Sequence, residues 1–489
     1  MPNVTIMQFS DLHKTLSASE SSNTLVSSIV SDIGRYASEN IPISKPDALV
    51  VCGDIIRGST SSKKEVKEQY ERALDLLNHL CTQTFDGNKE RVILVPGNHD
   101  ISWPHSRTSM TKLDKSDNNS TKLLKEPRSY VRWSWDDLSF YRISDANSYN
   151  QRFLPFARFY SAFYNGKRKY SLNPQEQFDV FEFPEKKLLI VGFNSCFCND
   201  HLNYTGMINP ECMAACHSRV NNEKHKGWIK VAVWHHGVHG VPSESDFMDE
   251  RTIQFLIDKG FIIGLHGHQH KSDLFDATFS ADRLQKMLVF GCGTLSAPNA
   301  ELPPGETRQY NIIEILRDRS TIRLHIRKAV DLPPGLHVWM PGNVRQNYDR
   351  SYMDIKIDTT VFDTGKGRIK RGKGRRRRMS RKLVEAEQLV AVKEYASALD
   401  KLKALSQDDP FVRRLTVECL FQLEKIDDLV QYIKDPTTIT EFTFLCEALW
   451  RRKKVNMLKE LVEKYREIPE FAESEPFKRV DSRLKASEV

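Results

Sequence analysis

The chain has 489 residues, 39% of them hydrophobic and 28% charged, with a formal net charge of +8 at pH 7. This length exceeds one ordinary domain, and the composition is typical of a globular protein. No stretch approaches the ~20 consecutive apolar residues that a membrane-spanning helix needs, which argues against a membrane protein of that kind.

The first hundred residues alternate between strand-like and helix-like patterns. Short apolar runs typical of buried strands occupy residues 4–9, 48–52 and 91–95. Between them, Leu25, Ile29 and Ile33 fall on one face of a predicted helix, and residues 62–81 are again helical. This order predicts a sheet with crossover helices. In such sheets ligands gather beyond the carboxyl ends of the strands, and a polar cluster follows each of the three runs.

Residues 102–180 interrupt this alternation. The segment is polar at first and then rich in aromatic residues, among them Trp133, Phe156 and Tyr160. We expect an inserted lid or cap here. Its rings, together with the basic triplet at 167–169, could stack on nucleobases. The alternative is that the rings form the core of a helical cap.

Regular strands are predicted again beyond this insertion. They occupy residues 188–193, 229–234, 261–265, 287–291, 310–316 and 321–327. The last two alternate like an antiparallel hairpin. Residues 331–364 carry several Pro and Gly residues and one alternating run, so we interpret them as edge strands or a linker. The first domain is therefore predicted over residues 1–330.

A basic segment separates this domain from a different kind of sequence. Residues 366–382, in a predicted linker at 365–382, hold eleven Lys or Arg and no acid, which leaves a net charge of −3 for the rest of the chain. The segment could bind a nucleic-acid backbone without reading its sequence, or it could be a solvated linker. In residues 383–489, helical patterns recur every ~30 residues, as in tetratricopeptide-type hairpins. We expect an all-α helical-repeat domain that binds a protein partner.

Five short polar clusters follow predicted strands. They are Asp11-Leu12-His13, Gly53-Asp54, Gly97-Asn98-His99-Asp100, His235-His236 and His266-Gly267-His268-Gln269-His270. Each cluster alone would be weak, but eight of the 15 histidines lie in or beside them. Alternate side chains of an extended segment share a face, so Asp11 and His13 should point together, as should His268 and His270. Carboxylate, imidazole and amide ligands without a thiolate suit Mn²⁺, Fe or Zn²⁺ and predict a two-metal site.

In this order the clusters resemble the calcineurin-like metallophosphoesterase superfamily, over roughly residues 3–330. The pattern of that superfamily is D-x-H, G-D, G-N-H-D/E, a lone His and G-H-x-H. The resemblance implies an α/β fold with two facing sheets flanked by helices. It also implies a phosphoester hydrolase with two divalent metal ions, for which we expect Mn²⁺, with Fe or Zn²⁺ as alternatives.

The resemblance further assigns roles to single residues. Its metal ligands would be Asp11, His13 and His270 for one ion, Asn98, His235 and His268 for the other, and Asp54 for both. His99 would protonate the leaving oxygen or stabilise the charge of the transition state, and Asp100 would orient His99. A metal-bound hydroxide would be the nucleophile, so no covalent phospho-enzyme is implied.

One departure from the superfamily pattern concerns the double histidine. Pro usually follows it, whereas Gly237 stands here. This leaves open whether His235 or His236 is the ligand, and we choose His235 because it directly continues the predicted strand. His239 and His266 are expected to support the site rather than to bind a metal.

The clusters look most like those of the cyclic-nucleotide phosphodiesterase and repair-nuclease branches. The G-D-x-x-D-R-G block of the Ser/Thr protein phosphatases is not matched by residues 53–58. We therefore expect a phosphodiesterase that acts on nucleotides or nucleic acid. In a second hypothesis the chain is an effector or scaffold, for example in bacterial defence, whose repeats regulate the phosphoesterase. Every predicted ligand position is filled, which favours the enzyme.

The cysteines and the N-terminus indicate a cytoplasmic protein. Nine cysteines, an odd number spread over the chain, fit free thiols in a reducing compartment. A structural zinc held by Cys196, Cys198, Cys212, Cys216 and His217 is an alternative, but paired C-x-x-C motifs are absent. The first residues lack the basic start and the apolar core of a signal peptide, and they lead directly into the first polar cluster.

Overall fold

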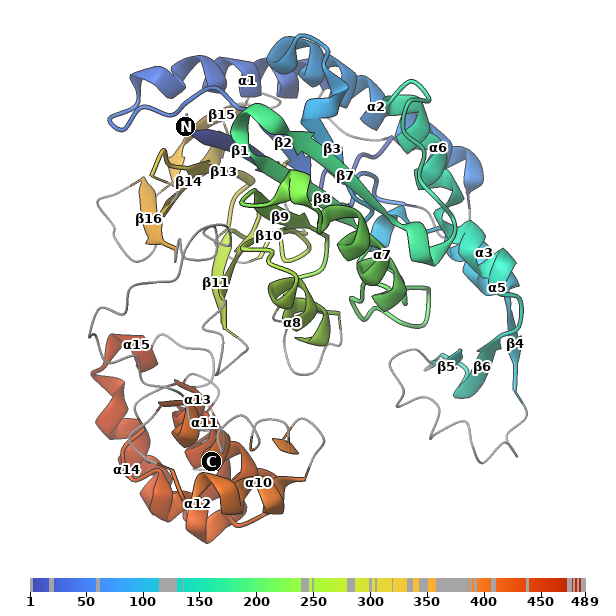
Figure 1. The fold of residues 1–489 in the computed structure, drawn as a ribbon. Helices are drawn as coiled ribbons and strands as arrows, with labels where there is room; N and C mark the ends of the chain where they lie inside the picture. Colours follow the sequence, from blue (N-terminus) through green and yellow to red (C-terminus); the bar gives the residue numbers. More distant parts are fainter. Residues whose placement is uncertain are drawn as a thin grey trace. The chain divides into compact units, whose positions relative to one another are not determined.

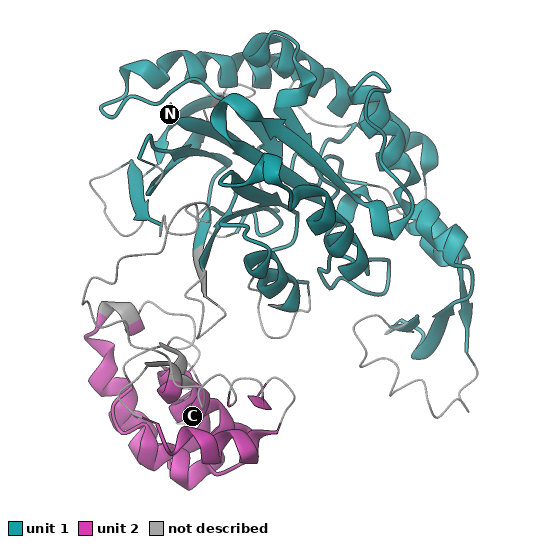
Figure 2. Ribbon diagram, in the orientation of Figure 1, with its two compact units in different colours: residues 1–279, 285–368 teal, residues 280–284, 369–489 magenta. Residues whose placement is uncertain are grey.

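The computed structural model describes most of the chain. The described residues are 3–16, 22–58, 62–113, 130–134, 136–238, 246–248, 250–278, 286–298, 301–303, 306–318, 320–331, 337–342, 351–357, 386, 389–390, 394–405, 410–436, 439–472, 477, 480–481 and 483–484. The chain divides into two compact units (Figure 2), residues 1–279 with 285–368 and residues 280–284 with 369–489. The predicted basic segment at 366–382 and His239 lie outside the described residues.

The first unit contains two large sheets (Figure 1). The strands of the first sheet are β1 (Val4–Phe9), β2 (Ala48–Val51), β3 (Val92–Leu94), β13 (Gln309–Ile315), β14 (Thr321–Asp331), β15 (His337–Gly342) and β16 (Tyr352–Lys356). They follow the order β15-β14-β13-β1-β2-β3, with β16 paired to β14. β1, β2 and β3 are parallel, since helices cross over between them, and β13 to β16 pair antiparallel. β15 and β16 occupy the region expected to hold edge strands.

The second sheet has a parallel centre and two antiparallel edges. Its strands are β7 (Phe178–Phe183), β8 (Leu188–Phe193), β9 (Ile229–Val233), β10 (Ile263–His266), β11 (Asp273–Thr278) and β12 (Lys286–Gly291), in the order β11-β12-β10-β9-β8-β7. The parallel pairings are those among β8, β9, β10 and β12. β7 and β11 have no counterpart in the sequence prediction.

The main core lies between the two sheets. Ile6 and Val50 of the first sheet share one apolar cluster with Ile190 and Val231 of the second. The outer face of the first sheet is covered by α1 (Ser22–Arg35) and α2 (Lys63–Phe85). Leu189 and its neighbours on the other face of the second sheet pack with α7 (Pro210–Val220) and α8 (Glu250–Asp258). The result is two sheets flanked by helices, as the resemblance implies.

Residues 102–180 divide between a small separate sheet and the main body. The small sheet has the order β4-β6-β5, from Met110–Lys112, Ser139–Ile143 and Val131–Ser134. By contrast, α6 (Leu154–Phe163) packs on α2, and its Phe156, Phe159 and Tyr160 are buried in the main core. These rings are therefore not available to stack on bases, and core formation is the alternative that the structure supports.

The second unit is helical and has its own apolar core. Its main helices are α10 (Tyr395–Leu402), α11 (Pro410–Gln422), α12 (Ile426–Tyr432), α13 (Ile439–Arg451) and α14 (Val455–Arg466). One turn geometry occurs twice, because the Lys425 amide donates to the Leu420 carbonyl and the Lys454 amide to the Leu449 carbonyl, both at 2.9 Å. A tetratricopeptide-type repeat stays a prediction. In the part of the chain that the structure describes, no helix combines the length and the apolar character needed to cross a bilayer.

Candidate metal centre

Loops from both sheets converge at the carboxyl ends of five parallel strands. The first sheet supplies the loops after β1, β2 and β3, and the second sheet those after β9 and β10. Backbone hydrogen bonds join loops within each sheet, from the Asp11 amide to the Gly53 carbonyl at 3.1 Å and from the Gly267 amide to the His235 carbonyl at 3.0 Å. The two sets of loops also meet each other, because the His268 amide donates to Asp11 Oδ2 at 3.0 Å.

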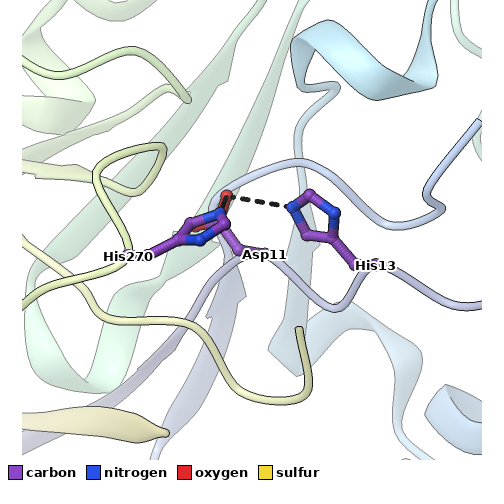
Figure 3. Close-up of side chains that lie close together, drawn as sticks. All are labelled: Asp11, His13 and His270. Carbon is purple, nitrogen blue, oxygen red and sulfur yellow. Dashed lines mark ion pairs between the residues drawn. The ribbon is translucent and has the colours of Figure 1, made fainter. Parts of the chain in front are cut away.

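One group of side chains contains Asp11, His13 and His270 (Figure 3). The Oδ1 atom of Asp11 lies 3.3 Å from Nε2 of His270 and 3.7 Å from Nε2 of His13. All three potential ligand atoms lie within 4.8 Å of one another. This is the set that the sequence predicts for one metal ion.

A second group contains Asn98, His235 and His268. The Oδ1 atom of Asn98 lies 2.8 Å from Nε2 of His235 and 3.1 Å from Nδ1 of His268. The two ring nitrogens are themselves 3.2 Å apart. This is the set predicted for the other metal ion.

Asp54 lies between the two groups. Its Oδ2 atom is 3.5 Å from Nε2 of His13 in the first group and 3.3 Å from Nε2 of His235 in the second. The structure thus brings all seven predicted ligands together, with the Asp54 carboxylate between the two groups.

The residues present fit two divalent cations. Among the described residues, Asp11 Oδ1 and His13 Nε2 are fully buried atoms with no hydrogen-bond partner, which is costly in a folded protein. A cation between them would satisfy both atoms. The available donors are oxygen and nitrogen atoms only, a set that suits Mn²⁺, Fe or Zn²⁺.

The electrostatics of the group also favour a cation. Burial opposes ionisation of Asp11 and Asp54, but the histidines around them hold the pKa of both carboxyls well below the ordinary value. Burial likewise opposes charging of His13 and His235, yet the two aspartates raise the pKa of His13 to about 10 and that of His235 to about 9. Without a metal, protons on the histidines balance the buried negative charge, and a cation would replace them.

The tautomers of the ligand histidines are set by groups around the site. Nδ1 of His235 lies 2.7 Å from the Cys52 carbonyl, and Nδ1 of His270 lies 2.8 Å from the Glu301 carbonyl. Since a carbonyl can only accept, both Nδ1 atoms donate, which leaves Nε2 of each ring free for a metal. His268 has the opposite arrangement, with Nε2 at 3.1 Å from the Asp246 carboxylate and Nδ1 toward Asn98.

Five of the predicted ligands have left-handed backbone conformations. They are Asp11 (φ 52°), His13 (φ 43°), Asp54 (φ 51°), His268 (φ 71°) and His270 (φ 52°). Residues other than glycine rarely adopt such angles, and they concentrate at functional sites. The expectation that Asp11 and His13 point together because they continue an extended strand is therefore wrong in its reason. Left-handed loop residues turn these side chains inward.

Two glycines allow the loops to approach one another. A Cβ atom on Gly97 would lie 2.1 Å from Asp54 Oδ1, and one on Gly267 would lie 1.6 Å from Ser10 Oγ and 2.6 Å from Asp11 Oδ2. Both distances are far below van der Waals contact. Gly97 and Gly267 are thus needed because a larger residue would collide with Asp54 and Asp11.

His99 lies beside the bridging carboxylate. Its amide donates to Asp54 Oδ1 at 2.9 Å, and its Nδ1 lies 2.8 Å from the Arg57 carbonyl, so Nδ1 is the donor. Its Nε2 atom is 4.0 Å from Asp54 Oδ2, and 41% of its side-chain surface is exposed. His99 can therefore hold a proton on Nε2 at the open side of the cluster.

Asp100 has a different role from the predicted one. Its carboxylate accepts from the amides of Gly97 at 2.8 Å and Ile55 at 3.2 Å, and from the Tyr70 hydroxyl at 3.1 Å. The ring of His99 is oriented by the Arg57 carbonyl instead. Asp100 thus ties the loop after β3 to the loop after β2, and it acts on His99 only through the backbone. Burial and the charge of Asp54 raise the pKa of Asp100 to about 7.

The structure favours His235 over His236 as the ligand. Nδ1 of His236 lies 2.8 Å from Ser195 Oγ rather than within the two groups. His266 supports the site, as expected, because its carbonyl accepts from Gln8 Nε2 and its ring stacks on Trp234.

The cysteines do not form a metal site in the described part of the chain. Cys196, Cys198, Cys212 and Cys216 are buried free thiols, and the groups of described residues able to hold a metal contain no cysteine. Small buried residues are thus the interpretation that the structure supports for this cluster.

Sequence reasoning missed two acids that contact the ligands. Asp246 accepts from His268, and Glu301 Oε2 lies 3.2 Å from Nδ1 of His13 while its Oε1 lies 2.8 Å from Nη2 of Arg57. Each is a single acid in a loop with no motif around it, so only the fold reveals its position. Asp246 orients the ring of His268, whereas the Glu301 carboxylate lies near His13 as a charge partner without a hydrogen bond to its Nδ1.

Comparisons with known proteins agree with this geometry. A family model described as calcineurin-like phosphoesterase matches residues 4–272, more than half of the chain. An uncharacterized metallophosphoesterase-like protein, YydB of Bacillus subtilis (strain 168), is 27% identical over 241 residues. That match covers 46% of this chain and 41% of YydB, so the chain spans less than half the length of this relative.

Two solved structures show weak similarity. A dimetal phosphatase from Danio rerio has a TM-score of 0.36 and 12% identity, with 67% of this chain and 97% of that chain covered. A Vps29 single mutant from Entamoeba histolytica has a TM-score of 0.27 and 10% identity, with 73% and 100% covered. The family match covers the strands and loops that carry all seven predicted ligands. The chain belongs to the calcineurin-like phosphoesterase family.

Proposed function

We propose that this chain is a phosphodiesterase that acts on nucleotides or nucleic acid with two Mn²⁺ ions. The family implies a metal-dependent phosphoester hydrolase. The observation that carries the proposal is the convergence of two three-residue groups on the single carboxylate of Asp54, with His99 beside it. The preference for diesters is supported by the sequence at 53–58, which lacks the acidic residue and spacing of the protein phosphatase motif.

In this proposal, Asp11, His13, His270 and Asp54 would hold one ion, and Asn98, His235, His268 and Asp54 the other. When bound, two divalent cations lower the pKa of a water molecule and neutralise charge on phosphoryl oxygens. The chain itself fixes the ligand tautomers and supplies a proton at the open side of the cluster. His99 donates through Nδ1 to the Arg57 carbonyl, so Nε2 is the ring nitrogen through which a proton would pass to the leaving oxygen.

The test compares substrates and variants of the purified protein loaded with Mn²⁺. Substrates are bis-p-nitrophenyl phosphate, p-nitrophenyl phosphate, cyclic nucleotides, and single- and double-stranded DNA. We expect Asp54→Ala to lose metal binding, because it removes the ligand shared by both groups. His99→Ala should keep both ions and lose about 10²- to 10⁴-fold in turnover, the usual effect of a lost general acid. His79→Ala, a change on the outer helix α2, is the matched control.

The outcomes separate the parts of the proposal. Hydrolysis of p-nitrophenyl phosphate alone would overturn the choice of a diesterase. Retention of full turnover by His99→Ala would overturn the role of His99. Loss of both ions in His99→Ala would show that this side chain acts as a ligand.

The helical unit is proposed to recruit a protein partner, and the basic segment at 366–382 to bind nucleic acid without sequence preference. The separate core of the helical unit supports this division of labour. Removal of residues 365–489 should then leave hydrolysis of bis-p-nitrophenyl phosphate intact and weaken retention on a DNA column. A truncated protein that still folds but no longer hydrolyses the small ester would contradict it.

A further inference from the structure

A cavity of about 650 Å³ lies beside the loop that carries His99. Its walls come from the N-terminal half of α2, from α3 (Trp103–Thr108) and from α6, which packs on α2. This volume is in the range of sites for small organic ligands. Neither the metal groups nor the proposed mechanism uses the cavity.

One wall of the cavity contacts the loop that carries His99. Tyr70 lines the cavity and donates its hydroxyl to the Asp100 carboxylate at 3.1 Å. Asp100 in turn accepts from the Gly97 amide at 2.8 Å, one residue before the metal ligand Asn98. A second wall residue, Ser102, lies three residues beyond His99. The cavity is therefore linked to the loop of the metal groups through the hydrogen bond between Tyr70 and Asp100.

The lining of the cavity combines apolar walls with positive charge. Leu74, Pro104 and Leu154 contribute apolar surface. Lys63 and Arg158 are exposed at its edge and, within the described residues, have no acidic partner.

The positive field of the cavity acts on His105 at its wall. Burial and then the charges of Lys63 and Arg158 lower the pKa of His105. Two further lysines of the cavity, Lys64 and Lys67, are only loosely paired, with acids of α2 at 3.7 and 3.6 Å. Lys63, Lys64 and Lys67 lie in the first turns of α2, where the helix dipole is positive and by itself favours anions. The charge of this region is complementary to an anion.

We infer that this cavity binds a nucleoside of the substrate together with the phosphate next to it. The inference rests on the proposed function, which it extends by assigning the group that distinguishes a nucleotide substrate from a simple diester. The planar base would lie between the apolar walls, and the adjacent phosphate would face Lys63 and Arg158. No bond is made or broken in the cavity.

The kinetic test uses two chromogenic diesters with the same leaving group. Bis-p-nitrophenyl phosphate has no nucleoside, whereas the p-nitrophenyl ester of thymidine 5′-monophosphate has one. The measured quantity is the ratio of kcat/KM for the thymidine ester to kcat/KM for bis-p-nitrophenyl phosphate. We expect the double variant Lys63→Ala/Arg158→Ala to lower this ratio about tenfold, since two partly exposed charge contacts are lost.

A second variant fills the cavity without changing charge. Ala162 is an exposed residue of α6 at the cavity wall, and Ala162→Trp places an indole there. It should lower the same ratio at least tenfold, because the nucleoside is excluded by volume. The matched control is Lys45→Ala/Lys169→Ala, which removes the same charge at two exposed positions outside the cavity. This control should leave the ratio unchanged.

Equilibrium binding gives an independent readout. Calorimetric titration of thymidine 5′-monophosphate into the metal-free protein should show binding that both cavity variants weaken about tenfold. Equal binding by wild type and Ala162→Trp overturns the inference, while continued hydrolysis of bis-p-nitrophenyl phosphate keeps the proposed function. Inorganic phosphate that binds as tightly as the nucleotide also overturns it, because the apolar walls would then contribute nothing.

Discussion

Replacement of Asp246 should weaken metal binding although this residue is not a metal ligand. Its carboxylate accepts from His268 Nε2 at 3.1 Å, which directs the Nδ1 lone pair of the same ring toward Asn98 and His235. Outer partners of this kind typically contribute 10- to 100-fold to metal affinity. The side chain of Asp246 is 34% exposed, so solvent screens its charge and the lower end of that range applies.

We therefore expect Asp246→Ala to weaken Mn²⁺ binding about tenfold, or ~1.4 kcal/mol. Asp246→Asn should weaken it only about threefold, because the amide oxygen still accepts the hydrogen bond and only the negative charge is lost. The affinity is measured by calorimetric titration of the metal-free protein. Asp258→Ala, at an exposed position on α8, is the matched control. Wild-type affinity in Asp246→Ala, or weaker binding by the Asn variant than by the Ala variant, would refute the reasoning.

Four further predictions concern the loops, the protons on the site histidines and the core. Gly97→Ala should abolish binding of both ions, because the added Cβ displaces the Asp54 carboxylate. The control Gly34→Ala, with open space around it, should leave metal binding intact. The metal content of both variants is measured after gel filtration. Below pH ~9, metal uptake should release protons from His13 and His235, so the affinity for the metal should rise with pH. Calorimetry in buffers of different ionisation enthalpy counts the released protons. Metal uptake without proton release would contradict the assignment of these histidines as ligands. In the metal-free protein, the same raised pKa values give stability that is present below pH ~6.5 and is lost as pH rises through about 9 to 10. Arg327→Ala should cost ~2–3 kcal/mol in urea unfolding, because the buried Asp32 loses its hydrogen bonds to this cation and keeps only Arg35, among the described residues, as a basic partner. A cost below ~1 kcal/mol would show that solvent or Arg35 compensates for the loss.

The order of elements and the ligand set could be predicted because they depend on local pattern. Apolar runs marked β1, β8 and β9 to within a residue or two, and polar clusters stood directly after them. The strand β11 escaped prediction, since its Asp-rich sequence lacks the alternation of a half-buried strand.

The predictions that failed depended on tertiary contacts. Asp100 follows His99 in sequence, which suggested a direct contact, but its carboxylate accepts from the loop amides of Ile55 and Gly97 and from the Tyr70 hydroxyl on α2. Asp246 and Glu301 contact ligand rings across gaps of 22 and about 290 residues, and nothing in their neighbours marks them. The aromatic residues of α6 gave the pattern of a core helix and of a stacking surface alike, and only packing against α2 decides between them.

Strain and charge together explain why these loops are suited to a cation. Each left-handed ligand residue costs on the order of 1–3 kcal/mol, and five of them gather within a few ångströms. The strain is offset by backbone hydrogen bonds such as those from Asp11 to Gly53 and from Gly267 to His235, which do not involve a metal. The fold therefore fixes the loop geometry in advance, and it leaves Asp11 Oδ1 and His13 Nε2 buried without partners. A cation bound between these residues would replace the protons that balance the carboxylates and would satisfy both atoms within the loop geometry already present, so its binding would require little reorganisation.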